Sequence, residues 1–165
     1  MKRRSAMKIS VLCVGKIKES FYREAVAEYA KRLSRYGRLE ILEAADEKTP
    51  DQPSEAQRLQ ILKKEGERLQ KYLAKDAFHV ALAIDGKKLD SVGFASRLEQ
   101  LGVSGVSHVQ FLIGGSLGLD QELLENADLK LSFSDMTFPH QLMRVILLEQ
   151  LYRAFRIMNG EPYHK

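Results

Sequence analysis

The sequence has little cysteine and no long apolar segment, and each shortage excludes a class of protein. Its 165 residues include one cysteine, Cys13, so neither a disulfide framework nor a zinc site built from several thiolates can form. The longest early apolar run, residues 9–14, is too short for the core of a signal peptide or for a membrane span. A lone thiol and no targeting segment lead us to expect a cytoplasmic protein that has no contact with a membrane.

The charge of the chain is only modestly basic. The formal net charge is +4, of which Lys2, Arg3 and Arg4 supply three units. Such a balance is a weak indication of a nucleic-acid partner. Residues 16–38 carry seven Lys or Arg against three Glu, a pattern that fits either a phosphate-facing patch or the solvated face of a helix.

Apolar periodicity divides residues 7–165 into alternating strands and helices, and we interpret residues 1–6 as a disordered leader. Short segments of strand length that are rich in apolar residues predict strands at residues 8–14, 38–44, 78–84, 109–113 and 129–133. Helical spacing predicts helices at residues 22–35, 54–73, 91–101, 120–126 and after Pro139. Ser54 and Ser91 are the expected caps of two of them. The alternation predicts one α/β domain with a mainly parallel sheet and helices on both faces.

Three predicted strand ends are candidates for a binding site. Ligands of open parallel sheets bind beyond the carboxyl ends of the strands, which here are residues 83–86, 114–118 and 133–138. A dinucleotide fold would place a G-x-G-x-x-G turn after the first strand, and residues 15–18 do not match it. A Walker loop is absent too. We therefore expect a small ligand held by main-chain groups and apolar walls.

A serine hydrolase is an alternative, because residues 114–118 match G-x-S-x-G with Ser116 at the centre. The required acid and histidine follow in the chain order of an α/β-hydrolase, as Asp128 or Asp135 and then His140 or His164. The chain is short for that fold, it shows no oxyanion loop of the HGGG type, and the next helix begins only at Asp120. These features count against the alternative without removing it.

The last predicted helix is apolar on nearly every side and yet carries three arginines. Arg144 lies close to the preceding loop, where an arginine can hold an anionic oxygen. Arg153 and Arg156 fit salt bridges and an RNA backbone equally well. The apolar surface is broader than one sheet face needs, which predicts a twofold homodimer through Leu142, Val145, Ile146, Leu148, Leu151, Tyr152 and Phe155.

The four histidines show no metal-ligand spacing, so no metal is expected. His79 and His108 lie at strand starts, which is typical of a structural role. His140 fits either a cap of the last helix or a lining of the preceding loop, and we favour the cap. His164 differs from these because it lies in a chain end that also keeps a proline and a tyrosine.

Taken together, several segments resemble the ribosomal RNA large subunit methyltransferase H family, a group of SPOUT-class enzymes. The resemblance spans residues 7–165 and rests on six segments: residues 8–16 (KISVLCVGK), 113–115 (IGG), 131–140 (LSFSDMTFPH), the Arg144 helix, 151–154 (LYRA) and 162–164 (PYH). It implies an α/β trefoil knot in the C-terminal half of the chain. It also implies a homodimer that uses S-adenosyl-L-methionine to methylate N3 of a pseudouridine in the 23S rRNA of the assembled ribosome. A non-catalytic ribosome-binding factor is the other alternative.

The resemblance also implies site residues. In the family the cofactor binds at the knot, which corresponds here to Leu82, Gly114, Gly115, Leu131, Ser132, Phe133, Ser134, Asp135 and Met136. Our hypothesis for catalysis is that Arg144 stabilises charge on a pyrimidine carbonyl. Tyr163 and His164, from the other subunit, would position the base or relay its proton.

Overall fold

A computed structural model describes residues 7–165, so the prediction of a disordered leader at residues 1–6 falls outside the described chain. The strands are β1 (Lys8–Val14), β2 (Arg38–Ala44), β3 (Phe78–Lys88), β4 (His108–Ile113) and β5 (Leu129–Ser132). The helices are α1 (Ser20–Leu33), α2 (Glu55–Gln70), α3 (Ser91–Val103), α4 (Gln121–Asn126) and α5 (His140–Met158). Within residues 7–165, no helix combines the length and the apolar character needed to cross a membrane.

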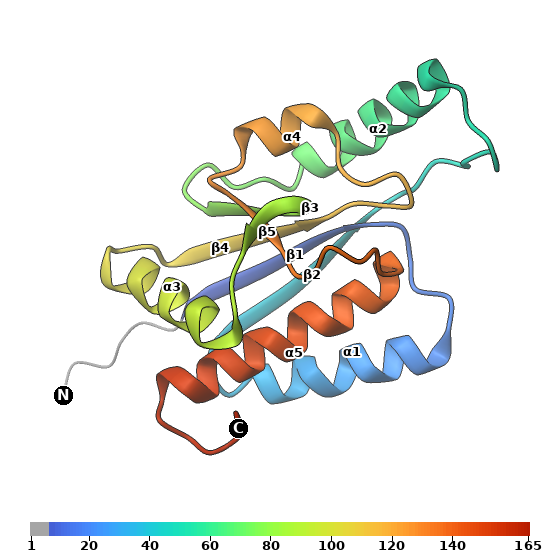
Figure 1. The fold of residues 1–165 in the computed structure, drawn as a ribbon. Coiled ribbons are helices and arrows are strands. Elements are labelled where there is room, and N and C mark those ends of the chain that lie inside the picture. The colour runs from blue at the N-terminus through green and yellow to red at the C-terminus, as the bar shows by residue number, and fades with distance from the viewer. Residues whose placement is uncertain (1–6) are drawn as a thin grey trace.

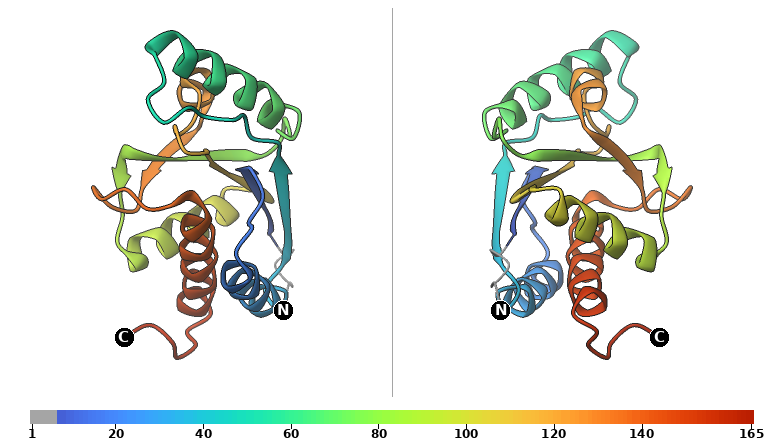
Figure 2. Two further views of the ribbon diagram at one scale, coloured as in Figure 1. Left: turned by 90° about the vertical axis from the view of Figure 1, so that its right-hand side faces the viewer. Right: turned by 90° about the vertical axis from the view of Figure 1, so that its left-hand side faces the viewer.

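The strands form one parallel sheet in the order β2-β1-β4-β3-β5. Helices α1, α3 and α5 cover one face, and α2 and α4 cover the other (Figures 1 and 2). The predicted α/β class, with a parallel sheet between two helical layers, is confirmed. The strand order is compatible with the trefoil knot, whose threading stays a prediction.

The register of the central strand β1 with its neighbours explains why the carboxyl ends of these strands lie close together. All of β1 except Lys8 is buried, because β1 lies between two neighbours and under helices on both faces. Its register pairs Val14 with Ala44 of β2 and Cys13 with Ile113 of β4. The carboxyl ends of three strands therefore lie at the same edge, next to the start of α5.

Strand β3 is longer than the sequence predicts. The Asp85-Gly86 pair is typical of a turn, but β3 continues to Lys88 after a shift of register with β5 between Leu82 and Lys87. A Cβ at Gly86 would lie 2.7 Å from the carbonyl carbon of Lys130. The absence of a side chain at this position therefore lets the two strands stay paired where the backbone bends.

Two predicted helix starts have different outcomes. Ser54 forms the predicted capping box, because its hydroxyl accepts from the N–H of Gln57 at 3.1 Å and Gln57 Oε1 accepts from the N–H of Ser54 at 2.9 Å. The prediction that Ser91 caps α3 is wrong. Asp90 accepts from the N–H of Gly93 at 2.7 Å, and the Ser91 hydroxyl donates to Gln150 of α5 instead.

Helix α5 packs lengthwise between α1 and α3 and against the sheet. Leu148, Leu151 and Phe155 are buried in the core of this chain, so the prediction that they belong to a dimer surface is wrong. Of the predicted surface, Leu142, Val145, Ile146 and Tyr152 remain half-exposed. The first three of these side chains recur at the spacing of one helix face.

Candidate cofactor pocket

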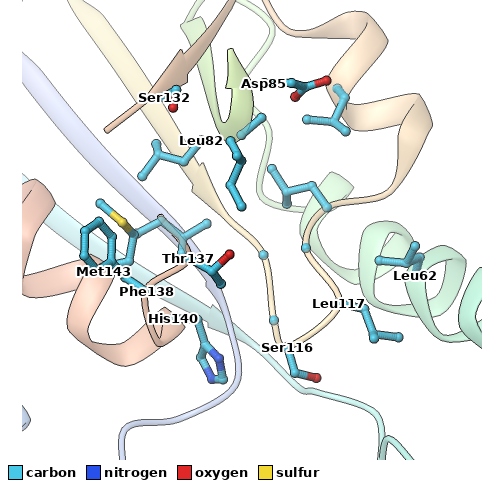
Figure 3. Close-up of a pocket in the computed structure, with 18 of the residues that line it drawn as sticks. Leu62, Leu82, Asp85, Ser116, Leu117, Ser132, Thr137, Phe138, His140 and Met143 are labelled. Atoms are coloured by element: carbon cyan, nitrogen blue, oxygen red, sulfur yellow. The ribbon is translucent and has the colours of Figure 1, made fainter. Parts of the chain in front are cut away.

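A cavity of about 1020 Å³ lies beside residues 82–85 in the middle of β3 and at the carboxyl ends of β4 and β5, and it extends to the first turn of α5 (Figure 3). Eight of the nine residues expected to bind the cofactor line it: Leu82, Gly114, Gly115, Leu131, Ser132, Phe133, Ser134 and Met136. Asp135 does not line the cavity, since its carboxylate is exposed and pairs with Lys88 Nζ at 2.5 Å. The fold thus brings together strand ends that are about fifty residues apart in sequence.

The turn after β4 forms one wall from main-chain atoms. A Cβ at Gly114 would lie 2.2 Å from both the carbonyl carbon and the oxygen of Gly118, which no side chain tolerates. Gly118 has a φ of +89°, and its N–H donates to the Gly115 carbonyl at 3.0 Å. The turn is therefore closed on itself, and it offers its backbone to the cavity without intervening side chains.

The loop after β5 forms the opposite wall and is shaped by its own hydroxyl groups. Ser132 Oγ donates to the Ser134 carbonyl at 3.1 Å, and Ser134 Oγ accepts from the N–H of Met136 at 2.9 Å. Thr137 and Phe138 continue this wall, although they are not among the residues assigned to the cofactor from sequence. The sequence contained a signal for these two residues, because the candidate strand end at residues 133–138 includes them. The residues assigned to the cofactor, however, stopped at Met136.

His140 and Met143, from the first turn of α5, complete the cavity and were also missed (Figure 3). The favoured role for His140 as a helix cap is wrong, because Pro139 holds the cap position and no side chain caps the helix. The imidazole lines the pocket half-buried, and burial, followed by the nearby Arg144 charge, lowers its pKa. The negative charges of Asp46 and Glu19 act in the other direction and raise this pKa more weakly.

Arg144 lies inside the protein and does not line the cavity. Its side chain is 2 % exposed, its Nη1 pairs with Glu43 Oε2 at 2.6 Å, and its Nη2 donates to the Gly15 carbonyl at 2.6 Å and more weakly to that of Val14. These bonds join α5 to the carboxyl ends of β1 and β2. The placement fits a residue that positions the pocket walls better than one that contacts a substrate.

The chain end folds back on α5 through an ordered set of polar contacts. Tyr163 donates to Glu149 Oε1 at 3.1 Å, and the Arg153 guanidinium lies 4.7 Å from the centre of the Tyr163 ring. Arg153 also pairs with Glu149, and its Nη1 lies 3.1 Å from His164 Nδ1. Burial, with the neighbouring Glu149 carboxylate, raises the pKa of Tyr163. The salt-bridge interpretation of Arg153 is confirmed.

Arg156 likewise bonds within the chain, to Glu161, to the Tyr36 hydroxyl and to the Pro162 carbonyl. The chain leaves α5 at the end opposite to His140 and then folds back along the helix (Figure 1). Its contacts with Glu149 and Arg153 lie about 14 and 20 Å along the helix axis from His140. Tyr163 and His164 do not reach the pocket of their own chain.

The charged side chains around the cavity are mostly acidic. Arg58 is the single Lys or Arg in the lining, against Glu55, Asp85 and Asp120. Such a lining disfavours a polyphosphate ligand and accepts a ligand that carries positive charge. Groups of three or more His, Cys, Asp or Glu that could hold a metal ion are not found among residues 7–165.

Ser116 is not part of a hydrolytic triad in the part of the chain that the structure describes. Its hydroxyl is exposed and bonds to Thr49 Oγ1 at 3.4 Å. The candidate acids have other partners, since Asp128 accepts from the N–H of His79 and Asp135 pairs with Lys88. The geometry gives the serine-hydrolase alternative no support.

Comparisons with known proteins agree along nearly the whole chain. A family model described as a predicted SPOUT methyltransferase matches residues 7–164. The ribosomal RNA large subunit methyltransferase H of Bifidobacterium adolescentis is 59 % identical over 159 residues, covering 96 % of this chain and 100 % of that protein. That of Bifidobacterium animalis subsp. lactis is 58 % identical over the same length and with the same coverage.

A solved structure shares the fold at low sequence identity. It is a probable methylase family protein from Haemophilus influenzae, which superposes with a TM-score of 0.52 at 12 % identity and covers 99 % of this chain and 72 % of that one. This likeness concerns the fold alone. On the strength of the family match and of the close relatives, the chain belongs to the SPOUT methyltransferase family, in its ribosomal RNA large subunit methyltransferase H group.

Proposed function

We propose that this protein transfers a methyl group from S-adenosyl-L-methionine to N3 of a pseudouridine in the 23S rRNA of the assembled ribosome. The observation that carries the proposal is the cavity at the strand ends, whose walls are the Gly114 turn and the loop after β5. The relatives that match the full chain are named as large-subunit rRNA methyltransferases, which supports the same substrate class.

The residues of the cavity fit the cofactor. Leu82, Leu131 and Phe133 supply apolar surface for an adenosine, and the bare backbone at Gly114 supplies polar groups at close range. The acidic lining suits the positive sulfonium better than it would suit a dinucleotide phosphate. When bound, the cofactor supplies an electrophilic methyl group, so the protein needs no nucleophile of its own.

The catalytic tail of each pocket comes, in our proposal, from a second copy of the chain. Tyr163 and His164 contact Glu149 and Arg153, about 14 to 20 Å along α5 from the first turn that lines the pocket of their own chain. The half-exposed face formed by Leu142, Val145 and Ile146 is a candidate dimer contact. If two α5 helices pack antiparallel across it, the tail of one copy comes to the first turn of the other.

Each part of this arrangement has a distinct task. Tyr163 and His164 orient the pseudouridine through their hydroxyl and imidazole groups. Arg144 acts indirectly, because its bonds to Glu43 and Gly15 fix the first turn of α5 that borders the pocket. N3 of the pyrimidine carries an imide proton, which has to leave before the nitrogen can accept a methyl group.

Labelled S-adenosyl-L-methionine tests the proposal when it is offered with intact ribosomes, separate large subunits and naked 23S rRNA. We expect label in 23S rRNA from assembled particles, at N3 of one pseudouridine. A protein that binds ribosomes but neither binds the cofactor in calorimetry nor transfers label is a non-catalytic factor. Loss of a hydrolytic activity on Ser116→Ala, together with labelling by a fluorophosphonate, would instead support a hydrolase.

A further inference from the structure

His140 is the one histidine that lines the cavity, and the described structure gives it no other task. The other histidines have partners elsewhere: His79 bonds to Gln110, His108 to Ser10, and His164 to Arg153. The His140 ring makes no hydrogen bond to residues 7–165, and no side chain caps α5. An imidazole left free at the wall of a pocket is available to a ligand.

His140 lies at the opposite end of the cavity from Ser132, one of the residues assigned to the cofactor. Figure 3 places His140 and Ser116 at one end of the pocket, with Ser132 and Asp85 at the other. The cavity of about 1020 Å³ is at the upper limit of single small-molecule sites, so it has room for a second group beside a cofactor. The His140 end borders the first turn of α5, where we place the partner's tail and the substrate base.

The surroundings of His140 favour the neutral form of its imidazole. Burial is the main cause, and Arg144, one turn away on the same helix, adds the effect of a permanent positive charge. Both lower the pKa of His140, while Asp46 after β2 and Glu19 before α1 oppose them more weakly. The ring is also the first residue of α5, where the helix dipole disfavours a positive charge. A neutral imidazole has a free lone pair near neutral pH.

We infer that His140 is the group that accepts the N3 proton of the pyrimidine base. In this step the N3–H bond breaks, its electron pair stays on N3, and the proton joins the unprotonated ring nitrogen of His140. The imidazolium then releases the proton to water, which the nearby Arg144 charge favours. The inference rests on the proposed function. It assigns the role of general base to His140 and leaves His164 of the tail with the task of orienting the pseudouridine.

The test compares wild type with His140→Gln. The matched control is His108→Gln, because His108 begins β4 and so lies at the end of that strand remote from the pocket. Single-turnover methyl transfer to ribosomes is measured from pH 5 to 9, and cofactor affinity is measured by calorimetry. We expect His140→Gln to lower the rate by about 10² or more while cofactor affinity is retained. The wild-type rate should rise with pH and be half-maximal below about 6.5, and the variant should lose this limb. His108→Gln should behave as wild type.

A second measurement does not depend on activity or on folding of a variant. NMR titration of the wild-type His140 ring should show it neutral at pH 7. A ring that is still protonated there, or a His140→Gln enzyme with the wild-type rate and acid limb, would overturn the inference while leaving the proposed function intact. If wild type transfers no methyl group at all, the proposed function fails and this inference fails with it.

Discussion

Gly114 shows how strongly one residue constrains the pocket. A methyl group there would meet the backbone of Gly118 at 2.2 Å, and backbone at a closed turn cannot move aside cheaply. We predict that Gly114→Ala destabilises the protein by about 1 to 3 kcal/mol and weakens cofactor binding. Urea unfolding and calorimetry measure the two effects.

Gly102 in α3 is the matched control for that substitution. A Cβ at Gly102 would be 3.6 Å from the Met7 methyl carbon, which is an ordinary contact. Gly102→Ala should keep cofactor binding and lose no stability, because alanine is the better helix residue by about 0.5 to 1 kcal/mol. Equal cofactor affinity in both variants would show that the Gly114 turn is not part of the site.

Glu65 on α2 is a buried carboxyl whose titration should be visible in stability. It is 4 % exposed, its Oε1 has no partner, and its Oε2 accepts from the N–H of Glu47 at 3.0 Å. Burial raises its pKa above the ordinary value of 4.5, so above that pH the folded state holds the proton more tightly than the unfolded state. Its contribution to stability is therefore present at low pH and is lost as pH rises through the raised value.

We predict that Glu65→Gln flattens this dependence, so that the free energy of unfolding falls less between pH 4.5 and 8 than in wild type. Urea unfolding at several pH values measures it. Glu67→Gln on the exposed side of α2 is the control and should keep the wild-type slope. A Glu65→Gln slope equal to that of wild type would contradict the assignment.

Among the elements, α5 is joined to the sheet by a buried polar side chain in addition to its apolar packing. Arg144 connects its second turn to Glu43 of β2 and to the carbonyls that follow β1. We predict that Arg144→Met costs about 3 kcal/mol, because it leaves the Glu43 carboxylate and the Gly15 carbonyl without their donor. The double variant with Glu43→Gln should lose less than the two single losses together.

Activity separates this positioning role from direct contact with substrate. If Arg144 acts through the pocket walls, stability and cofactor affinity fall together in Arg144→Met, as urea unfolding and calorimetry report. An Arg144→Met protein that is as stable as wild type, binds the cofactor normally and has lost methyl transfer would favour the direct role in charge stabilisation.

How far the sequence predicts these elements depends on how local their causes are. Strand β1 has the predicted bounds, because a largely apolar run between polar ends is a local signal. Strand β2 also has the predicted bounds, although Glu40 and Glu43 interrupt its apolar residues. The extension of β3 past Gly86 depends on pairing with β5, about forty residues away, so it has no local signal. The partner of Arg144 is 101 residues distant, and the charge environment of His140 comes from three separate segments. The pocket walls were predictable because the strand-end rule depends only on the order of elements.

At the scale of the whole molecule, the distance along α5 between the pocket and the tail is the decisive quantity. The tail contacts α5 at Glu149 and Arg153, about 14 to 20 Å along the helix axis from the first turn that lines the pocket, so one chain carries both halves of the proposed site without joining them. We predict that truncation after Gly160 abolishes methyl transfer and leaves cofactor affinity nearly unchanged, as calorimetry and labelled transfer would show. Lost cofactor affinity would place the tail in the cofactor pocket instead.

The most direct test of the composite site mixes two proteins that are each first shown to lack methyl transfer alone, Gly114→Ala with its tail intact and the chain truncated after Gly160 with its pocket intact. Random pairing makes half of the dimers mixed, and each mixed dimer holds one complete site. Methyl transfer to ribosomes should therefore recover to roughly a quarter of the wild-type rate after the subunits exchange. A mixture that stays inactive, although mixed dimers are shown to form, would contradict the account.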